Sequence, residues 1–203
     1  MNCCGALETC PTGLLDLTRE ACSLVGWRPG QRVIDIGCGE GSTVSYLRRE
    51  CGVSAFGVDL WLPRGEALFQ GCAECLPVAS GSLDGILAEC SLSAMADRDK
   101  VIAECARVLA PGGSLVIADL YARNGDSIAD GVLVCKELLE RIVAHGFQIR
   151  LWEDHSEVLK QLVFRVIMEH NCDSMEQICQ WKSVRAGYFL LIAKLPKRNG
   201  YGR

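Results

Sequence analysis

The stretch V-I-D-I-G-C-G-E-G-S, from Val33 to Ser42, combines an apolar run with three closely spaced glycines. Glycine has no Cβ, so its backbone takes positive φ at little cost and a ligand can approach the main chain closely. The stretch therefore predicts a strand, a glycine-rich turn and a helix that together hold an adenosyl ligand. The alternative interpretation is a tight strand-to-helix turn without a ligand.

The residues around this stretch favour a ligand site. Residues 33–36 form the strand candidate, residues 43–49 form the helix candidate, and Asp59 ends the run V-S-A-F-G-V-D. A nucleotide site of this kind has an acid about 20 residues after the turn, where it can accept from both ribose hydroxyls. We expect Asp35 at the end of the first strand, facing the occupant of the turn.

Length and composition predict one α/β domain, because 203 residues with 49% apolar and 23% charged side chains suffice for one buried core. The net charge is −4, and no block of Lys or Arg precedes the final residues, so no nucleic-acid partner is indicated. No apolar run approaches the about 20 residues of a membrane span, and the first ten residues lack the features of a signal peptide. We therefore predict a cytoplasmic protein without a membrane partner.

The chain contains 13 cysteines, most of them inside apolar periodic segments. Without an export signal, reduced and buried thiols are the expected state for Cys22, Cys51, Cys105 and Cys135. The spacing C-x-x-C occurs once, without the second pair that a zinc finger requires, so no metal site is predicted.

Strand and helix patterns alternate from Arg32 onward, which predicts βαβ units and a largely parallel sheet covered on both faces. Strands are expected at 33–37, 53–59, near 72–74, and at 83–89, 114–120, 147–152 and 188–195. Helices are expected at 14–25, 42–51, about 63–70, 97–109, 131–145, 155–169 and 174–181. The P-G-G at 111–113 should end one helix and turn into the next strand.

Several blocks in order resemble the class I S-adenosylmethionine (SAM) dependent methyltransferases. They are D-I-G-C-G-E-G at 35–41, G-V-D-L-W around Asp59, A-E-C-L-P-V-A-S-G-S-L-D-G-I-L at 73–87 and R-V-L-A-P-G-G-S-L-V-I-A-D at 107–119. The resemblance spans roughly residues 27–121. It implies a Rossmann-like fold with a seven-stranded, mostly parallel sheet of order 3-2-1-4-5-7-6, the last strand antiparallel, and helices on both faces.

The resemblance implies a single methyltransferase domain. Its parts would be an N-terminal lead-in and helix at 1–30, a SAM-binding core at 31–152, inserted helices at 153–185, and the last strand and tail at 186–203. The first and third parts would shape the substrate pocket. The implied reaction transfers a methyl group from SAM to a small molecule and releases S-adenosylhomocysteine; the substrate and the oligomeric state stay open.

The cofactor contacts are carried over to the positions that match the family's motifs. The cofactor-binding residues implied in this way are Asp35, Gly37, Cys38, Gly39, Asp59, Leu60, Ala73, Glu74 and Glu89. One departure concerns adenine, because many members have an acid where this chain has Cys72, and a thiol is a poor acceptor. Adenine would then be held by backbone groups of Ala73 and by Leu60 and Trp61, or Glu74 would turn inward.

Methyl transfer is an in-line displacement, so an enzyme can work largely by holding the nucleophile and the methyl group close together. Ligands in open α/β sheets lie beyond the carboxyl ends of the strands. We therefore expect Glu89, Cys90 and Ser91 after the fourth strand to face the methyl group, and Tyr121 after the fifth to line the substrate pocket.

Three further polar residues have two interpretations each. Asp119 and Arg123 either orient a substrate, or are a loop-capping acid and a solvated charge. Glu89 and His155 are the candidate catalytic residues. His155, in E-D-H-S at 153–156, could be a general base next to the pocket, because its ordinary pKa suits that role. Alternatively, this run simply caps the following helix.

Three rival functions stay open. The same strand, glycine turn and distal acid occur in NAD(P)-dependent oxidoreductases, although the glycine spacing and the P-G-G block argue against that class. A non-catalytic member that keeps the fold as a SAM-binding or partner module is the second. The third is a methyltransferase or binder of a thiophilic metalloid such as arsenite, with Cys3, Cys4 and Cys10 gathered near Cys72, Cys75 or Cys90.

Overall fold

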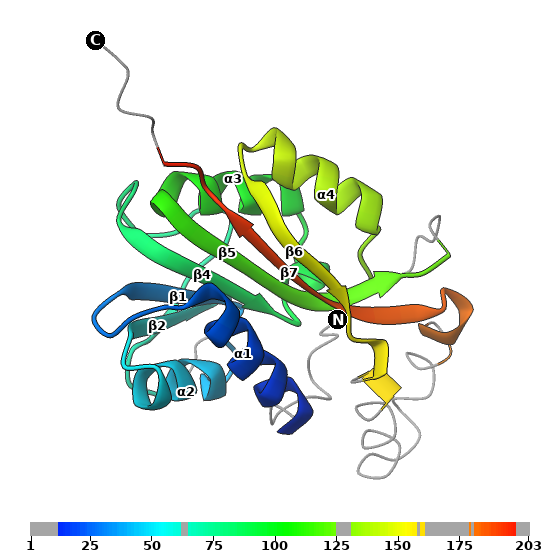
Figure 1. Ribbon diagram of the computed structural model, residues 1–203, viewed down its shortest axis with the longest axis horizontal. Helices are drawn as coiled ribbons and strands as arrows, with labels where there is room; N and C mark the ends of the chain where they lie inside the picture. The colour runs from blue at the N-terminus through cyan, green and yellow to red at the C-terminus, as the bar shows by residue number, and fades with distance from the viewer. Residues whose placement is uncertain are drawn as a thin grey trace.

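The structure is a computed structural model that describes residues 12–61, 65–124, 131–157, 159–160, 179 and 181–197, with the side chains of 12–15 left aside. A seven-stranded sheet of order β3-β2-β1-β4-β5-β7-β6 forms its centre (Figure 1). The strands are β1 Arg32–Ile36, β2 Ser54–Asp59, β3 Leu68–Gln70, β4 Leu83–Glu89, β5 Leu109–Ala122, β6 Gln148–Asp154 and β7 Ala186–Lys194. The first five strands pair in parallel, whereas β7 pairs antiparallel with both β5 and β6.

Helices cover both faces of this sheet (Figure 1). They are α1 Thr12–Val25, α2 Ser42–Glu50, the 3-10 turn η1 Leu92–Ala94, α3 Arg98–Val108 and α4 Cys135–Ala144. Helices α1 and α2 pack on one face together with Val33, and α3 and α4 pack on the other together with Ile34. Neighbouring strand residues point to opposite faces, so the continuous apolar run of β1 fills both layers at once.

The connections between the strands bring several strand ends together at one edge of the sheet. Parallel strands joined by helices bring their carboxyl ends to the same edge, which here carries the ends of β1, β2, β4 and β5. Among the helices with described residues, none is both long and apolar enough to cross a membrane.

The predicted sheet order, its antiparallel last strand and the helices on both faces are confirmed. The prediction of a helix at about 63–70 is wrong, because Leu68–Gln70 is strand β3, held by parallel pairing with β2. The strand expected near 72–74 is instead a turn closed by a bridge between Cys72 and Cys75. The P-G-G at 111–113 lies inside β5, which already begins at Leu109.

The helices expected at 155–169 and 174–181 lie mostly outside the described residues. Residues 156–157, 159–160, 179 and 181–183 are helical. The extended lead-in expected at 1–13 also lies almost wholly outside them. The domain boundaries proposed from the sequence therefore stay predictions.

Candidate cofactor and substrate site

The turn after β1 is held rigidly by backbone hydrogen bonds. The amides of Gly37 and Cys38 both donate to the carbonyl of Val58, at 2.7 and 3.3 Å, which ties the turn to the end of β2. Gly37 has φ of 75°, and a Cβ there would lie 2.4 Å from the Cβ of Ser91. The turn consequently requires glycine at this position for its conformation and for its close approach to β4.

Gly39 has a different role. Its φ is 50°, and a Cβ built on it would meet no atom within 4 Å. The glycine leaves open space above the main chain, and its amide donates to Oδ2 of Asp59 at 2.9 Å. This combination of an open backbone with an acid beside it is what a nucleoside ligand requires, so the residues present fit an adenosyl cofactor.

Asp59 closes the far side of this turn. Besides the Gly39 amide, its carboxylate accepts from the amide of Trp61 at 3.0 Å, through Oδ1. Leu60 and Trp61 follow it and are 62% and 66% exposed, which leaves two large apolar side chains at the rim. The predicted placement of Asp59 next to the glycine turn is confirmed; its contact with ribose stays a prediction.

Two acids lie near the turn. Asp35 is 3% exposed, and Glu89, at the end of the neighbouring strand β4, is partly buried. The Glu89 carboxylate accepts from the hydroxyl of Thr18 on α1, at 2.9 and 3.0 Å, and from that of Thr43 on α2, at 3.2 Å. The end of β4 is thereby tied to both helices of this face.

The electrostatics of these acids favour a cationic ligand. Burial raises the pKa of Glu89 to about 7, although the Thr18 and Thr43 hydroxyls oppose the rise. Burial also raises the pKa of Asp35 well above its ordinary value, and the charges of Glu89 and Asp59 raise it further. A positive charge placed here would stabilise both carboxylates in their ionised form.

Cys90 and Ser91 continue the chain beyond Glu89. Cys90 has a positive φ of 50°, and its Sγ lies 3.1 Å from the hydroxyl of Tyr188, which donates to the carbonyl of Ala118 at 3.0 Å. The Ser91 hydroxyl donates to the carbonyl of Ile36 at 2.7 Å. Ser91 is 7% exposed, so this side chain joins β4 to β1 rather than standing free in a pocket.

The capping interpretation of Asp119 is supported. Asp119 is 0% exposed, and its carboxylate accepts from the amide and the hydroxyl of Ser93, both at 2.8 Å, and from the amide of Leu120 at 2.7 Å. Burial raises its pKa to about 6 against these donors. Asp119 therefore fixes the η1 turn that follows β4.

A second polar group lies at the ends of β5 and β6. The Tyr121 hydroxyl donates to Oδ2 of Asp154 at 3.0 Å, and Arg123 pairs with the same oxygen at 3.1 Å. Oδ1 of Asp154 accepts from the amide of Ser156 at 2.8 Å, which is a helix-capping contact. Arg123 is paired with protein rather than being a purely solvated charge.

His155 lies between Asp154 and Ser156 of this group. Its Nε2 is 3.3 Å from Oε2 of Glu153, and its amide donates to the carbonyl of Tyr188 at 2.7 Å. Ligand atoms of Glu20, Glu153 and His155 all lie within 4.8 Å of one another. In the described part of the chain no hydrogen bond joins His155 to Glu89, so the two candidate catalytic residues belong to separate contact groups.

The turn expected to meet adenine follows β3. The Cys72 thiol donates to Oε2 of Glu74 at 2.5 Å, so the side chain that replaces the family's acid orients the next acid along. Ala73 lies between them, half-buried. None of the cysteines that the structure describes forms a disulfide.

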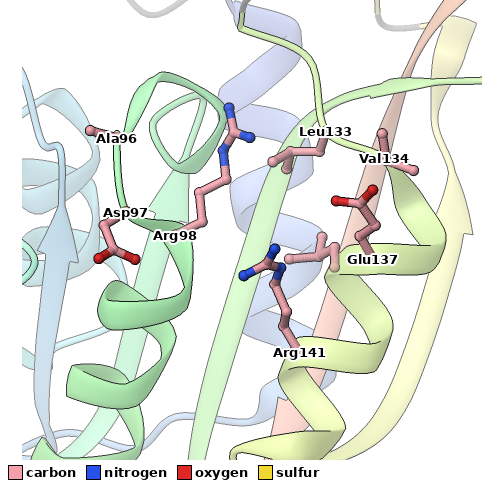
Figure 2. A pocket seen from close by; sticks show the side chains of 8 residues that line it. Ala96, Asp97, Arg98, Leu133, Val134, Glu137 and Arg141 are labelled. Atoms are coloured by element: carbon pink, nitrogen blue, oxygen red, sulfur yellow. The ribbon is translucent and has the colours of Figure 1, made fainter. Parts of the chain in front are cut away.

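A cavity of about 140 Å³ lies elsewhere, between the first turns of α3 and α4 (Figure 2). Its lining residues are Ala96, Asp97, Arg98, Leu133, Val134, Glu137, Leu138 and Arg141. None of the predicted cofactor or substrate residues lines it, and its charges of both signs balance. The glycine turn, with its backbone donors and buried acids, is therefore the better candidate site.

Some contacts were not predictable from the sequence. Thr18 and Thr43 hold Glu89, and Tyr188 contacts Cys90, across separations of 71, 46 and 98 positions. Thr18 lies in an ordinary amphipathic helix and carries no local signal. Tyr188 carries a weak one, because it brings a polar hydroxyl into an otherwise apolar run, Y-F-L-L-I-A.

The sheet order, the glycine turn and the acid after β2 together define the class I methyltransferase fold. Comparison with known proteins agrees: residues 34–117 match the family described as methyltransferase domain. The O-methyltransferase resE of Aspergillus sclerotiorum is 31% identical over 196 residues, covering 88% of this chain and 72% of that protein. An O-methyltransferase of Pyrenophora dematioidea is 31% identical over 148 residues, covering 66% of this chain and 55% of that protein.

Among solved structures, geranyl diphosphate C-methyltransferase from Streptomyces coelicolor A3(2) superposes with a TM-score of 0.75 at 17% identity, covering 89% of this chain and 77% of that chain. This likeness shows the fold alone. The chain spans about half the length of the Pyrenophora relative. The chain belongs to the class I SAM-dependent methyltransferase family.

Proposed function

We propose that this protein transfers a methyl group from SAM to an oxygen atom of a small organic molecule. The observation that carries the proposal is the glycine turn itself, with its open backbone at Gly39 and its amide bonded to Asp59 at 2.9 Å. When bound, SAM supplies a methyl group already activated on a sulfonium. The choice of oxygen rests on the relatives, since both proteins that match at 31% identity are named O-methyltransferases.

Each part of the site has a role in this proposal. Asp59 holds the ribose, the turn at 72–75 meets the adenine, and the buried Asp35 and the partly buried Glu89 attract the cationic methionyl end. Cys90 and Tyr121 line the acceptor pocket, and the segments at 1–30 and 153–185 complete it. The acceptor hydroxyl gives up its proton as the new carbon–oxygen bond forms and the carbon–sulfur bond breaks.

The proton acceptor is proposed to be solvent or His155. Glu89 has a pKa of about 7, in the range of a general base, but its carboxylate accepts from Thr18 and Thr43. We therefore assign Glu89 to cofactor binding first. His155, which is bonded to Glu153, is the better placed of the two to meet an acceptor at the ends of β5 and β6.

Calorimetric titration with SAM and S-adenosylhomocysteine tests the proposal, with Gly39→Ala as the decisive variant. Its added methyl group would project into the open space above the turn, so we expect at least about tenfold weaker binding. Gly30→Ala is the matched control, because Gly30 also has a positive φ, 84°, and no atom within 4 Å, but precedes β1 at the other end of the strand.

Transfer of a labelled methyl group to a panel of phenols and hydroxy acids then tests the reaction. Methylation of at least one hydroxyl compound is expected. If the native chain shows no saturable binding of either ligand, the proposal is wrong. Binding without transfer to any panel member would favour the non-catalytic alternative, and saturable NADH fluorescence would favour an oxidoreductase.

A further inference from the structure

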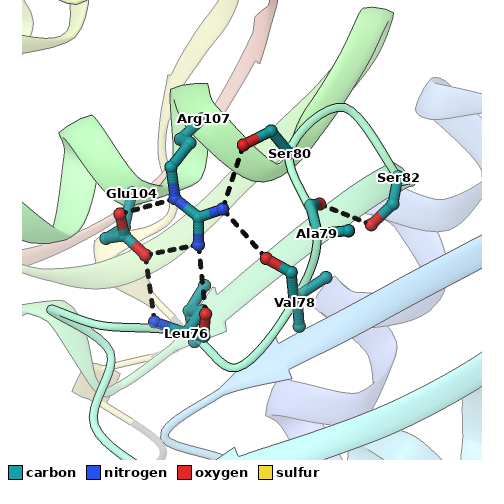
Figure 3. Close-up of polar contacts among 7 residues, drawn as sticks. All are labelled: Leu76, Val78, Ala79, Ser80, Ser82, Glu104 and Arg107. Atoms are coloured by element: carbon teal, nitrogen blue, oxygen red, sulfur yellow. Dashed lines mark hydrogen bonds and ion pairs between the residues drawn. The ribbon is translucent and has the colours of Figure 1, made fainter.

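Arg107 on α3 makes an unusually complete set of contacts with the segment that follows β3 (Figure 3). Its Nη1 donates to the carbonyl of Val78 at 2.9 Å and to the hydroxyl of Ser80 at 3.1 Å, and its Nη2 donates to the carbonyl of Leu76 at 3.0 Å. A planar guanidinium with five donors can hold several carbonyls at once, which a lysine ammonium cannot do in the same geometry.

Glu104, one helical turn earlier, completes the clamp. Nε and Nη2 of Arg107 both donate to its carboxylate at 2.8 Å, a two-point contact that fixes the plane of the guanidinium. The same carboxylate accepts from the amide of Leu76 at 3.0 Å. Both backbone groups of Leu76 are therefore bound by this one ion pair. Hydrogen bonding from Arg107 lowers the pKa of Glu104, so the pair stays charged at neutral pH.

Leu76 comes directly after the turn at 72–75, which the amide of Cys75 closes by donating to the carbonyl of Cys72 at 3.2 Å. On its other side the turn is held by Gly71, whose amide donates to the carbonyl of Asp59 at 2.8 Å. The turn is thus fixed at one end by the proposed ribose acid and at the other by the Glu104–Arg107 pair.

We propose that Arg107, acting with Glu104, is a positioning residue that sets the turn at 72–75 to recognise the 6-amino group of adenine. The inference rests on the proposed function, since it concerns the same cofactor. Arg107 does not touch the ligand; it fixes Leu76, and thereby the backbone of Ala73 and the carboxylate of Glu74. A purely structural arginine would add stability without changing which base the turn prefers.

The test compares S-adenosylhomocysteine with S-inosylhomocysteine, which carries an oxo group in place of the 6-amino group, by calorimetry. The native chain should prefer the adenosyl compound by about tenfold or more, because the unmatched oxo group leaves an acceptor facing acceptors. Arg107→Ala should weaken binding of the adenosyl compound by about tenfold and reduce the preference to less than about threefold. Arg107→Lys should resemble Arg107→Ala.

Arg150→Ala is the control, because Arg150 is exposed on β6, the opposite edge strand, and bonds Gln148. It should keep the full preference for the adenosyl compound.

The inference is wrong if Arg107→Ala weakens the binding of both ligands equally or of neither, or if the native chain has no preference. If Arg107→Ala does not fold, Glu104→Gln is the deciding variant, because it keeps an acceptor for the amide of Leu76 and loses the charge that fixes Arg107. An undiminished preference of Glu104→Gln for the adenosyl compound would overturn the inference. Failure of the native chain to bind either ligand would instead refute the proposed function.

Discussion

Glu89 is partly buried and contacts two helices, and its ionisation should be visible in the stability of the whole chain. Its pKa in the folded chain, about 7, exceeds its ordinary value of 4.5, so the folded state binds the proton more tightly. This contribution to stability is complete below pH 4.5 and is lost as the pH rises through about 7. Between pH 5 and 7.5 the native chain should therefore lose about 1–2 kcal/mol relative to Glu89→Gln.

Urea unfolding of both proteins at the two pH values measures this difference. Glu140→Gln, a change at an exposed carboxylate on α4, is the control and should follow the native pH profile. Asp35 and Asp119 also have raised pKa values and remain in every variant. Because the charge of Glu89 helps to raise the pKa of Asp35, the measured difference contains the coupling between these two acids as well as the ionisation of Glu89 itself. Parallel pH profiles for the native chain and Glu89→Gln would show that the pKa of Glu89 is not raised in the folded chain.

Asp59 supports the glycine turn in addition to its proposed contact with the ribose. Its two oxygens accept from the amides of Gly39 and Trp61, so truncation removes the support of the glycine turn together with the ribose acceptor. Asp59→Ala should weaken S-adenosylhomocysteine binding by more than about tenfold, since hydrogen bonds to a charged acceptor contribute about 1.5–3 kcal/mol. Calorimetry provides the measurement, with Asp84→Asn as the control, because Asp84 lies at the amino end of β4, at the other end of the strands from Asp59. Equal affinity of Asp59→Ala and the native chain would place the ribose elsewhere.

At the scale of elements, Thr18 joins α1 to Glu89 at the end of β4. Thr18 donates to both oxygens of Glu89, and Thr18→Val keeps its shape while removing the donor. We expect the amides of α1 to exchange faster by about one to two orders of magnitude, because a buried acceptor left without a donor costs about 1–3 kcal/mol. Hydrogen exchange followed by mass spectrometry measures this. Ser23→Ala, at an exposed position on the same helix, should leave exchange in α1 unchanged.

The strands differ in how well the sequence predicts them. Strands β1 and β4 were predictable because strands buried on both faces need continuous apolar runs, and Asp59 was placed by its spacing from the glycines. Strand β3 was not, because Leu68–Gln70 is short and mostly exposed and takes its conformation from pairing with β2. Contacts such as Arg107 to Leu76 and Thr18 to Glu89 join distant positions, and single-sequence periodicity carries no information about them.

For the whole molecule, the order of the strands in the sheet predicts which amides a bound ligand protects from hydrogen exchange. Strand β4 lies between β1 and β5, and β7 between β5 and β6, so their amides should exchange only when the entire domain unfolds. A ligand at about 100 times its Kd stabilises the folded state by about 2.7 kcal/mol, which slows such exchange about 100-fold. We expect S-adenosylhomocysteine to slow amide exchange in both β7 and β4 by this same factor, although β7 is not part of the glycine turn.

The end of α4 provides the internal reference, since amides near His145 can open locally on the face opposite α1 and α2 and should exchange at the same rate with or without ligand. If β4 slows but β7 does not, the antiparallel β6–β7 pair unfolds separately from the cofactor half. The proposed single domain would then consist of two cooperative units, because a ligand protects only amides that require disruption of its own site to exchange.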